Sequence, residues 1–281
     1  MSSQPLTNRM SPEDLEAIKQ AKHHMENIGF VMKGLNKLGN SLDSTIKKIP
    51  AKQQLWLQKQ VNKSLTLVVK SNLVTMQNGK TFKKPSNKTY KALVTTTGAL
   101  SGVLGSTTGI GTAIFASELA VSTKFMMRSI LDIARSHGEN LQDFETQMAC
   151  MQVFALGGKS KDDDGLETSY YTMRLALNSA AKGASAYVAK NGVQGLNKML
   201  IASSNPLMKL IGIIAGRFSI QVSEKFVAQA IPVLGAVGGG TINFVFLNHF
   251  QTVAEAHFKM RSLERKYGNE LVISTYNNLK I

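Results

Sequence analysis

Apolar residues recur at helical spacing along most of the chain, and no segment shows the alternation of apolar and polar residues that predicts a β-strand. The first predicted helix begins at Pro12, which suits the first helical position, and Ser11 can cap it. This helix runs toward the stop signal Gly39-Asn40. The pattern therefore predicts an all-α protein, a multi-helix bundle with helical hairpins.

The second predicted helix follows Pro50, extends to about Asn78 and carries its lysines in one stripe. Four lysines are spaced i, i+7, i+11 and i+18: Lys52, Lys59, Lys63 and Lys70. At 100° per residue they fall on one narrow arc, opposite the apolar residues at 57, 61, 65 and 68. This is the pattern of a basic amphipathic helix. Its lysine face is either simply solvated above a core-facing stripe or faces anionic lipid, with nucleic acid as a third alternative.

A stretch without any charge, residues 92–117, follows a lysine-rich connector and is rich in Gly, Ala, Ser and Thr. Its glycines recur at i, i+4, i+7 and i+11: Gly98, Gly102, Gly105 and Gly109. On a helix they would share one face, where a second backbone can pack closely, and a glycine-rich loop is the alternative. The stretch is long enough to cross a bilayer, which takes about 20 residues, but its Ser and Thr make it a poor free-standing span.

Helical patterns continue over 113–136, over 167–190 and again from Pro206, with a loop expected at 157–167. The small-residue spacing recurs in four further glycines: Gly212, Gly216, Gly235 and Gly239. A second charge-free stretch, residues 226–254, is interrupted by Pro232 and glycines, and this predicts a hairpin or kinked pair of helices rather than one rod. We expect the last helix to end at Tyr267-Gly268, before a short polar tail.

The helix predicted over 113–136 carries a ladder of charged residues on one face. Its members alternate in sign at spacings that favour mutual pairing: Lys124, Arg128, Asp132, Arg135 and Glu139. The ladder is either a solvated face of ion pairs or a buried polar network. In the second case Glu118, which lies on the preceding turns, would join it.

Charge is distributed unevenly along the chain. The formal net charge of the 281 residues is +15, and residues 1–91 hold 16 Lys and Arg against 5 Asp and Glu, a balance of +11. We therefore divide the chain into a basic N-terminal helical region, 1–91, and a helical core, 92–281, within one domain. Most basic residues are lysines, which attract phosphate diffusely rather than read bases, so an anionic membrane surface is the preferred partner and nucleic acid ranks last.

Several sequence features argue against cofactors and an oxidising compartment. The single cysteine, Cys150, cannot form an internal disulfide, and residues 1–20 lack the apolar core of a secretory signal. Gly158-Lys159-Ser160 resembles the end of a phosphate-binding loop, but Val153 stands where its first glycine belongs. No pattern of zinc or calcium ligands is complete. We expect no metal, no cofactor and a cytoplasmic protein, peripheral to or partly embedded in the inner face of the cell membrane.

Polar residues within apolar segments are the candidates for chemistry. Five of them could act as acid, base or ligand if they met in one pocket: Glu118, Asp132, Glu224, His249 and His257. On that hypothesis the protein is a hydrolase or transferase with a polar site inside the bundle. The alternative is that these residues pair ions and cap helices within the bundle. No complete catalytic motif is present, which favours a protein that is not an enzyme.

Two long segments resemble the EcsC family. One contains RSILDIARSHGEN at 128–140 and ACMQVFALGG at 149–158, and the other runs from Arg217 to RSLERKYG at 261–268. With Tyr171-x-x-Arg174 between them, the resemblance covers about residues 12–270. The family's motif residues correspond to Glu118, Arg128, Asp132, Arg135, Glu139, Arg217, Glu224, Gln229, Pro232, Asn243, His249, His257, Arg261 and Glu264. The lysine-rich first third departs from the family pattern.

The resemblance implies a helical bacterial protein with no settled reaction or cofactor, working at membranes near transport or secretion functions. It also suggests a polar network made of Arg128, Asp132, Arg135, Glu139, Arg217, Asn243, Arg261 and Glu264. Our leading hypothesis is a membrane-associated, non-enzymatic helical protein, with a membrane protein complex or a second copy of the chain as further partners. The other alternative is a membrane-perturbing effector or toxin, in which the glycine-spaced hairpins insert and self-associate.

Overall fold

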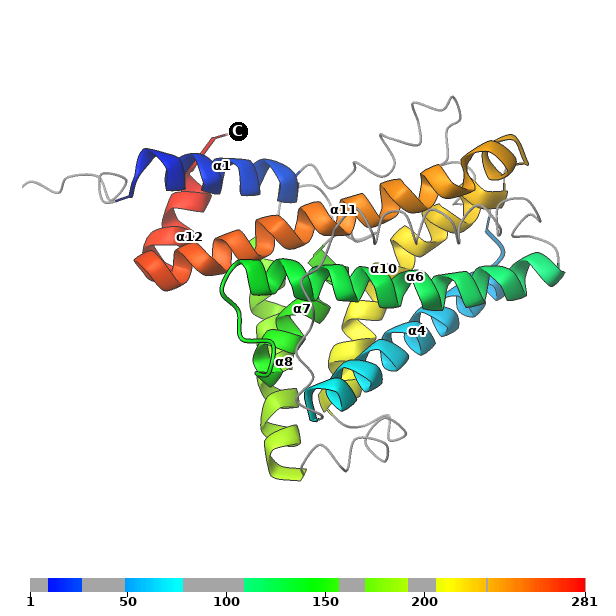
Figure 1. Cartoon of the computed structure of the whole chain (residues 1–281), viewed down its shortest axis with the longest axis horizontal. Helices are drawn as coiled ribbons and strands as arrows, with labels where there is room; N and C mark the ends of the chain where they lie inside the picture. Colours follow the sequence, from blue (N-terminus) through cyan, green and yellow to red (C-terminus); the bar gives the residue numbers. More distant parts are fainter. Residues whose placement is uncertain are drawn as a thin grey trace, which may run out of the picture.

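The computed structural model describes residues 10–26, 49–77, 109–156, 170–191, 206–230 and 232–280, and within these ranges the chain forms helices and no strand (Figure 1). The helices are α1 (Pro12–Glu26), α4 (Ala51–Gln77), α6 (Gly109–Ser136), α7 (Phe144–Leu156), α8 (Tyr170–Asn191), α10 (Pro206–Ala230), α11 (Pro232–Tyr267) and α12 (Asn269–Asn278). The predicted all-α multi-helix bundle is confirmed.

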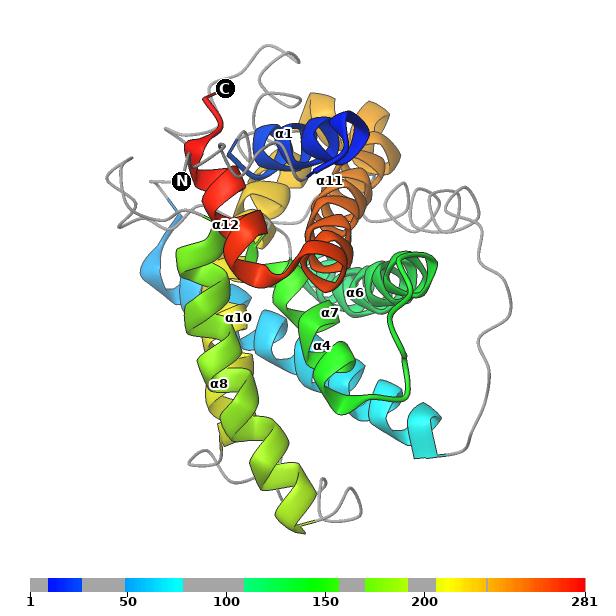
Figure 2. The same ribbon diagram turned by 90° about the vertical axis from the view of Figure 1, so that its left-hand side faces the viewer.

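Helix α11 is the axis of the bundle. Its 36 residues give a length of about 54 Å, and α6 runs beside it in the same direction (Figure 1). Helix α4 packs against α6 and α10, while α7 and α8 also pack against α10. Helix α1 lies along α11 and against α12. In Figure 2 the upper end of α8 lies near α12, and its lower end extends away from the other labelled helices.

The core is built from aromatic side chains that join helices far apart in sequence. Phe154 of α7, Phe218 of α10 and Phe250 of α11 are fully buried, with ring centroids 4.9 to 5.5 Å apart. A second group joins α4 to α6 and α10, because Trp56 and Phe226 both lie close to the ring of Phe115. Burial of such large rings, together with the aliphatic side chains of the core, drives the packing of the helices.

Local signals fix the helix ends as predicted. The Ser11 hydroxyl accepts a hydrogen bond from the backbone N–H of Asp14 at 3.2 Å, so the predicted cap of α1 is confirmed. Helix α1 ends at Glu26, and the predicted continuation toward residue 39 lies outside the described residues. Helix α10 ends at Ala230 and α11 begins at Pro232, and the two helices pack against each other. The predicted kinked pair over 226–254 is therefore confirmed.

The end of the chain differs from the prediction. The residues after Gly268 form helix α12 instead of a polar tail, because Val272 and Tyr276 lie four positions apart and are both buried. Gly268 starts this helix with φ of +85° and ψ of 150°, a conformation that only glycine adopts readily. The Lys22 ammonium of α1 donates to the carbonyl oxygens of Tyr276 and Leu279, and so ties α1 to the end of α12.

The glycine predictions have mixed outcomes. Gly212 and Gly216 are exposed on α10, and a methyl group at either position would meet no atom within 4 Å. The close helix packing predicted at this pair is therefore not seen among the described residues. Gly98, Gly102 and Gly105 lie outside them. Gly109 begins α6, and Gly235 and Gly239 lie in the first turns of α11, but the surroundings of these three are outside the described part of the structure.

None of the helices in the described ranges combines the length and the apolar character that a membrane crossing requires. Most of the charge-free stretch 92–117 precedes α6 and lies outside those ranges.

Substituting glycine with alanine at two positions tests these backbone assignments. Gly212→Ala should stabilise the protein by roughly 1 kcal/mol, because alanine is the better helix former and the space is open. Gly268→Ala should destabilise it by about 1 to 3 kcal/mol, because its φ is +85°. Both values are free energies of unfolding from urea titration. A loss of stability in Gly212→Ala would show that another part of the chain packs closely there.

Candidate functional site

A cavity of about 860 Å³ lies where four helices meet. Helix α7 contributes Gln152, α8 contributes Arg174, Asn178 and Lys182, α11 contributes Arg261 and Glu264, and α12 contributes Asn269 and Ile273. The first and last of these helices, α7 and α12, are more than 100 residues apart in sequence, so only the folded bundle creates the cavity. Its walls mix charged, amide and apolar groups, as in sites that orient small molecules.

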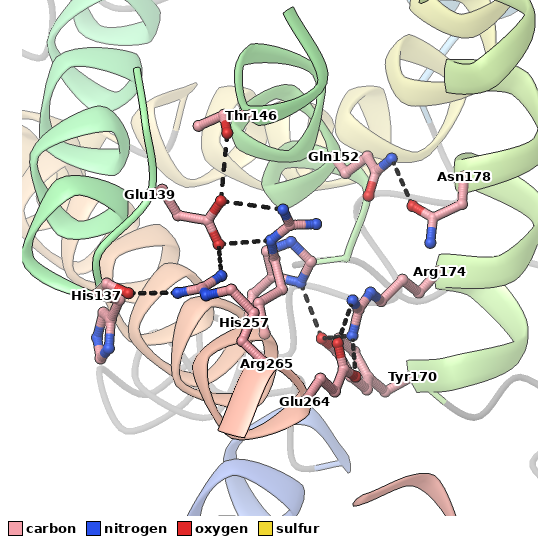
Figure 3. Close-up of polar contacts among 11 residues, drawn as sticks. His137, Glu139, Thr146, Gln152, Tyr170, Arg174, Asn178, His257, Glu264 and Arg265 are labelled. Atoms are coloured by element: carbon pink, nitrogen blue, oxygen red, sulfur yellow. Dashed lines mark hydrogen bonds and ion pairs between the residues drawn. The ribbon is translucent and has the colours of Figure 1, made fainter. Parts of the chain in front are cut away.

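A buried ion pair between α8 and α11 forms one wall. Arg174 Nη1 and Nη2 donate to Glu264 Oε1 and Oε2, each at 2.6 Å, which is a two-point contact (Figure 3). The Tyr171 hydroxyl also donates to Glu264 Oε1 at 2.9 Å, and Arg174 Nη1 reaches the Tyr170 oxygen at 3.2 Å. Both partners of the pair are less than 10% exposed, so the pair is held rigidly and shielded from salt.

His257 lies behind the Arg174–Glu264 pair and hydrogen-bonds to Tyr170, which Arg174 also contacts. Its Nδ1 shares a hydrogen bond with the Tyr170 hydroxyl at 2.9 Å, and its Nε2 has no partner in the described part of the structure. Burial, with Arg174 and Arg261 nearby, lowers the pKa of His257 well below 6.5, so the ring is neutral. Burial also raises the pKa of Tyr170 to about 12, which keeps its hydroxyl protonated.

A second ion cluster fastens the end of α6 to α11. Glu139 is buried, and it accepts hydrogen bonds from Arg261 Nε at 2.8 Å and Nη2 at 3.0 Å, from Arg265, and from the Thr146 hydroxyl (Figure 3). Burial acts to raise the pKa of Glu139, but the bonds from Arg261 and Arg265 outweigh it and lower the pKa. Glu139 is therefore a structural anion, and it neutralises Arg261 beside the cavity.

A third buried pair lies further along the bundle. Lys225 of α10 is fully buried and donates to Glu118 Oε1 of α6 at 2.7 Å, and Asn243 of α11 donates to the same oxygen at 2.9 Å. The Lys225 ammonium also lies 5.1 Å from the centre of the Phe246 ring. This arrangement places an ammonium between a carboxylate and an aromatic face, where burial of the charge is compensated.

Of the five polar residues expected to converge in one pocket, Glu118 and His257 lie far apart. Asn243, the partner of Glu118, and His257 are fourteen positions apart on α11, a distance of about 21 Å along the helix. Asp132 pairs with Arg135 on its own helix at 3.3 Å. Glu224 lies half-buried on α10 and His249 is buried on α11. None of the five is among the residues that line the cavity.

The predicted polar network is divided into separate pairs by the structure. Glu139 bonds Arg261, Glu264 bonds Arg174, and Asn243 bonds Glu118. Arg217 donates to the backbone oxygen of Ala155 at 3.1 Å. Two residues of the predicted charge ladder, Lys124 and Arg128, are exposed on α6. Sequence analysis missed Lys225, Arg265, Gln152 and Asn178. Of these four residues, only Gln152 stands out in the sequence, because it is a polar residue inside the apolar run of α7.

Helix α4 presents a different kind of surface. Lys52, Lys59, Lys63 and Lys70 are all exposed, while Leu57, Val61, Leu65 and Val68 are buried. Two leucines of the same helix are exposed as well, Leu55 by 68% and Leu67 by 50%. The outward side of α4 therefore carries both lysines and two leucines.

Comparisons with known proteins give one match. The model of the EcsC protein family matches residues 12–263. No curated protein and no solved structure matches the chain.

Removing one partner of the Arg174–Glu264 pair should strongly destabilise the protein. Arg174→Met leaves the Glu264 carboxylate buried without its cation and should cost about 3 to 5 kcal/mol in the free energy of unfolding. The double variant Arg174→Met, Glu264→Met should recover about 1 kcal/mol or more of that loss, because no charge is then left alone. Equal stability of single and double variants in a urea titration would contradict this account of the pair.

Stability should fall with pH below about 6.5 because His257 is buried as the neutral ring. The unfolded chain binds a proton there and the folded protein does not, so the loss should approach about 1.4 kcal/mol per pH unit. Urea titrations at pH 7 and pH 5 measure it. His257→Asn, which retains a polar partner for Tyr170, should show a smaller pH dependence, whereas exposed His23→Asn should behave as the wild type. An unchanged slope in His257→Asn would disprove the assignment.

Proposed function

The chain belongs to the EcsC protein family, and we propose that it is a non-enzymatic protein that binds the anionic surface of a membrane through helix α4. The proposal places it at the cytoplasmic face of the cell membrane, where the family resemblance suggests work beside transport or secretion complexes. The observation that carries it is the combination of lysines and leucines exposed on α4. This helix lies at the lower edge of the bundle in Figure 1, with its buried side toward α6 and α10.

The exposed side chains of α4 are arranged as a membrane surface requires. At 100° per residue the four lysines lie within about 20° of one line, and Leu55 and Leu67 lie about 60° to either side of it. The helix contains no acidic residue, so nothing on it competes with lipid phosphate for the lysines. In this orientation the lysines meet the lipid phosphates, and the leucines flank them at the level of the headgroups.

The expected energies show that the lysines do not act alone. Each lysine near an anionic surface contributes about 1 kcal/mol, so four give about 4 kcal/mol, which corresponds to millimolar binding. Each leucine can add about 1.5 to 3 kcal/mol if its exposed side chain is fully buried in lipid. Binding in the micromolar range therefore needs both residue types, and the electrostatic part should weaken as salt is raised.

Flotation with vesicles tests the proposal. The protein should float with vesicles that contain phosphatidylglycerol, remain below those of phosphatidylcholine alone, and be released as the ionic strength rises from about 0.1 to 1 M. Replacing Lys52, Lys59, Lys63 and Lys70 with Gln should weaken binding by about a thousandfold at low salt, and Leu55→Ser with Leu67→Ser should weaken it at any salt concentration.

A control variant with the same net charge distinguishes an effect of the α4 face from an effect of the total charge. Replacing exposed Lys19, Lys124, Lys190 and Lys280 with Gln removes the same charge from other parts of the chain and should leave flotation nearly unchanged. Equal losses in the two quadruple variants would mean that the α4 face has no special role. Absence of the wild-type protein from anionic vesicles at low salt would rule out the proposal.

A further inference from the structure

The only tryptophan of the chain, Trp56, lies on α4 at the border between the exposed side of this helix and the core. It is partly buried and packs against the core. The centre of its ring lies 6.3 Å from that of Phe115 on α6 and 6.1 Å from that of Phe226 on α10. The two phenylalanine rings are 5.1 Å apart and nearly perpendicular. The indole thus completes a group of three rings that joins three helices.

The position of Trp56 along α4 places it on the outward side of the helix. At 100° per residue it lies about 40° from the line of the four lysines, nearer to that line than either exposed leucine. Lys52 and Lys59 precede and follow it by about one turn, and both are exposed. A small side chain at this angle would be fully exposed, whereas the large indole also reaches Phe115 and Phe226. Trp56 therefore belongs both to the lysine surface and to the core.

The chemistry of indole suits such a border position. Indole combines a large apolar surface with one polar N–H group, and tryptophan is enriched in proteins at the level of the lipid headgroups. Within the described ranges the indole N–H of Trp56 makes no hydrogen bond. This donor is therefore available to a phosphate or carbonyl oxygen of a lipid.

We propose that Trp56 contacts the membrane as well as the core, at the level of the lipid headgroups. The outer edge of the indole lies among the headgroups beside the lysines, while its inner edge stays packed against Phe115 and Phe226. The lipid is anionic, because α4 presents four lysines and contains no acidic residue. This inference rests on the proposed membrane function and adds to it a contact residue and a depth.

Fluorescence of the full chain tests the inference, because Trp56 is the sole tryptophan. Vesicles that contain phosphatidylglycerol should shift its emission to shorter wavelength, since the exposed edge of the indole loses contact with water. A spin label on the lipid headgroup should quench the emission more strongly than a label near the end of the acyl chain. The variant in which Lys52, Lys59, Lys63 and Lys70 are replaced with Gln should show neither effect at the same lipid concentration.

Two variants connect these signals to the position of the side chain. Trp56→Phe keeps an aromatic ring against the core and should bind the vesicles about fivefold more weakly, as expected for one lost hydrogen bond. Its circular dichroism spectrum and urea titration show whether the bundle remains folded. Adding Asn278→Trp to Trp56→Phe moves the tryptophan to an exposed position on α12, which lies apart from α4 in Figure 1. This double variant should show no emission shift and no quenching by the headgroup label.

Flotation distinguishes failure of this inference from failure of the proposed function. If the protein floats with anionic vesicles while the emission of Trp56 stays unchanged, membrane binding stands and the inference is overturned. Stronger quenching by the acyl-chain label, equal effects in the Asn278→Trp variant, or unchanged binding of folded Trp56→Phe would also overturn it. If the protein does not float, the proposed function fails and this inference fails with it.

Discussion

A carboxylate that is removed from water is stabilised by a cation, and each of the three buried glutamates in the described part of this bundle meets one that is distant in sequence. Glu118 meets Lys225, Glu139 meets Arg261, and Glu264 meets Arg174. In each case one or more hydrogen bonds involve α11, so this helix cannot shift by a turn without leaving a buried charge unpaired. Because burying an unpaired ion costs several kcal/mol, these contacts fix the parallel register of α6 and α11 more sharply than apolar packing alone.

The same constraint explains why a cavity can persist at the meeting point of four helices. Part of its wall is formed by Arg174, Glu264 and Arg261, and their ion pairs keep these side chains from turning inward to fill the space. Tyr170 and Tyr171 support Arg174 from behind, with the guanidinium 5.8 Å from each ring centre. A wall held in this way is pre-organised, which lowers the entropic cost of binding a small molecule. The proposed binding of α4 to a lipid surface, in contrast, needs no fixed geometry, because lysine side chains are flexible.

Local features of the sequence predicted the helices well. The Ser11-Pro12 start, the break at Pro232 and the two-sided pattern of α4 depend on residues near each other in the chain, and the structure places them as expected. The pairing of charges was not predictable in this way. Glu118 and Glu139 belong to one apparent ladder by spacing, yet their partners lie on α10 and α11, more than 100 residues away. Likewise, four glycine positions looked alike in sequence, while the open space at Gly212 depends on what the fold places beside it.

The contact between α1 and α12 brings the first and last described helices of the bundle together. Lys22 holds the end of α12, and Asp14 bonds Lys266 and Tyr267 at the end of α11, so the first and last described helices are neighbours. A protein with this topology suits circular permutation, because a short linker can join the two ends while new ends open elsewhere. It also means that force applied at the two ends would separate α1 from α12 before any load reached the aromatic core.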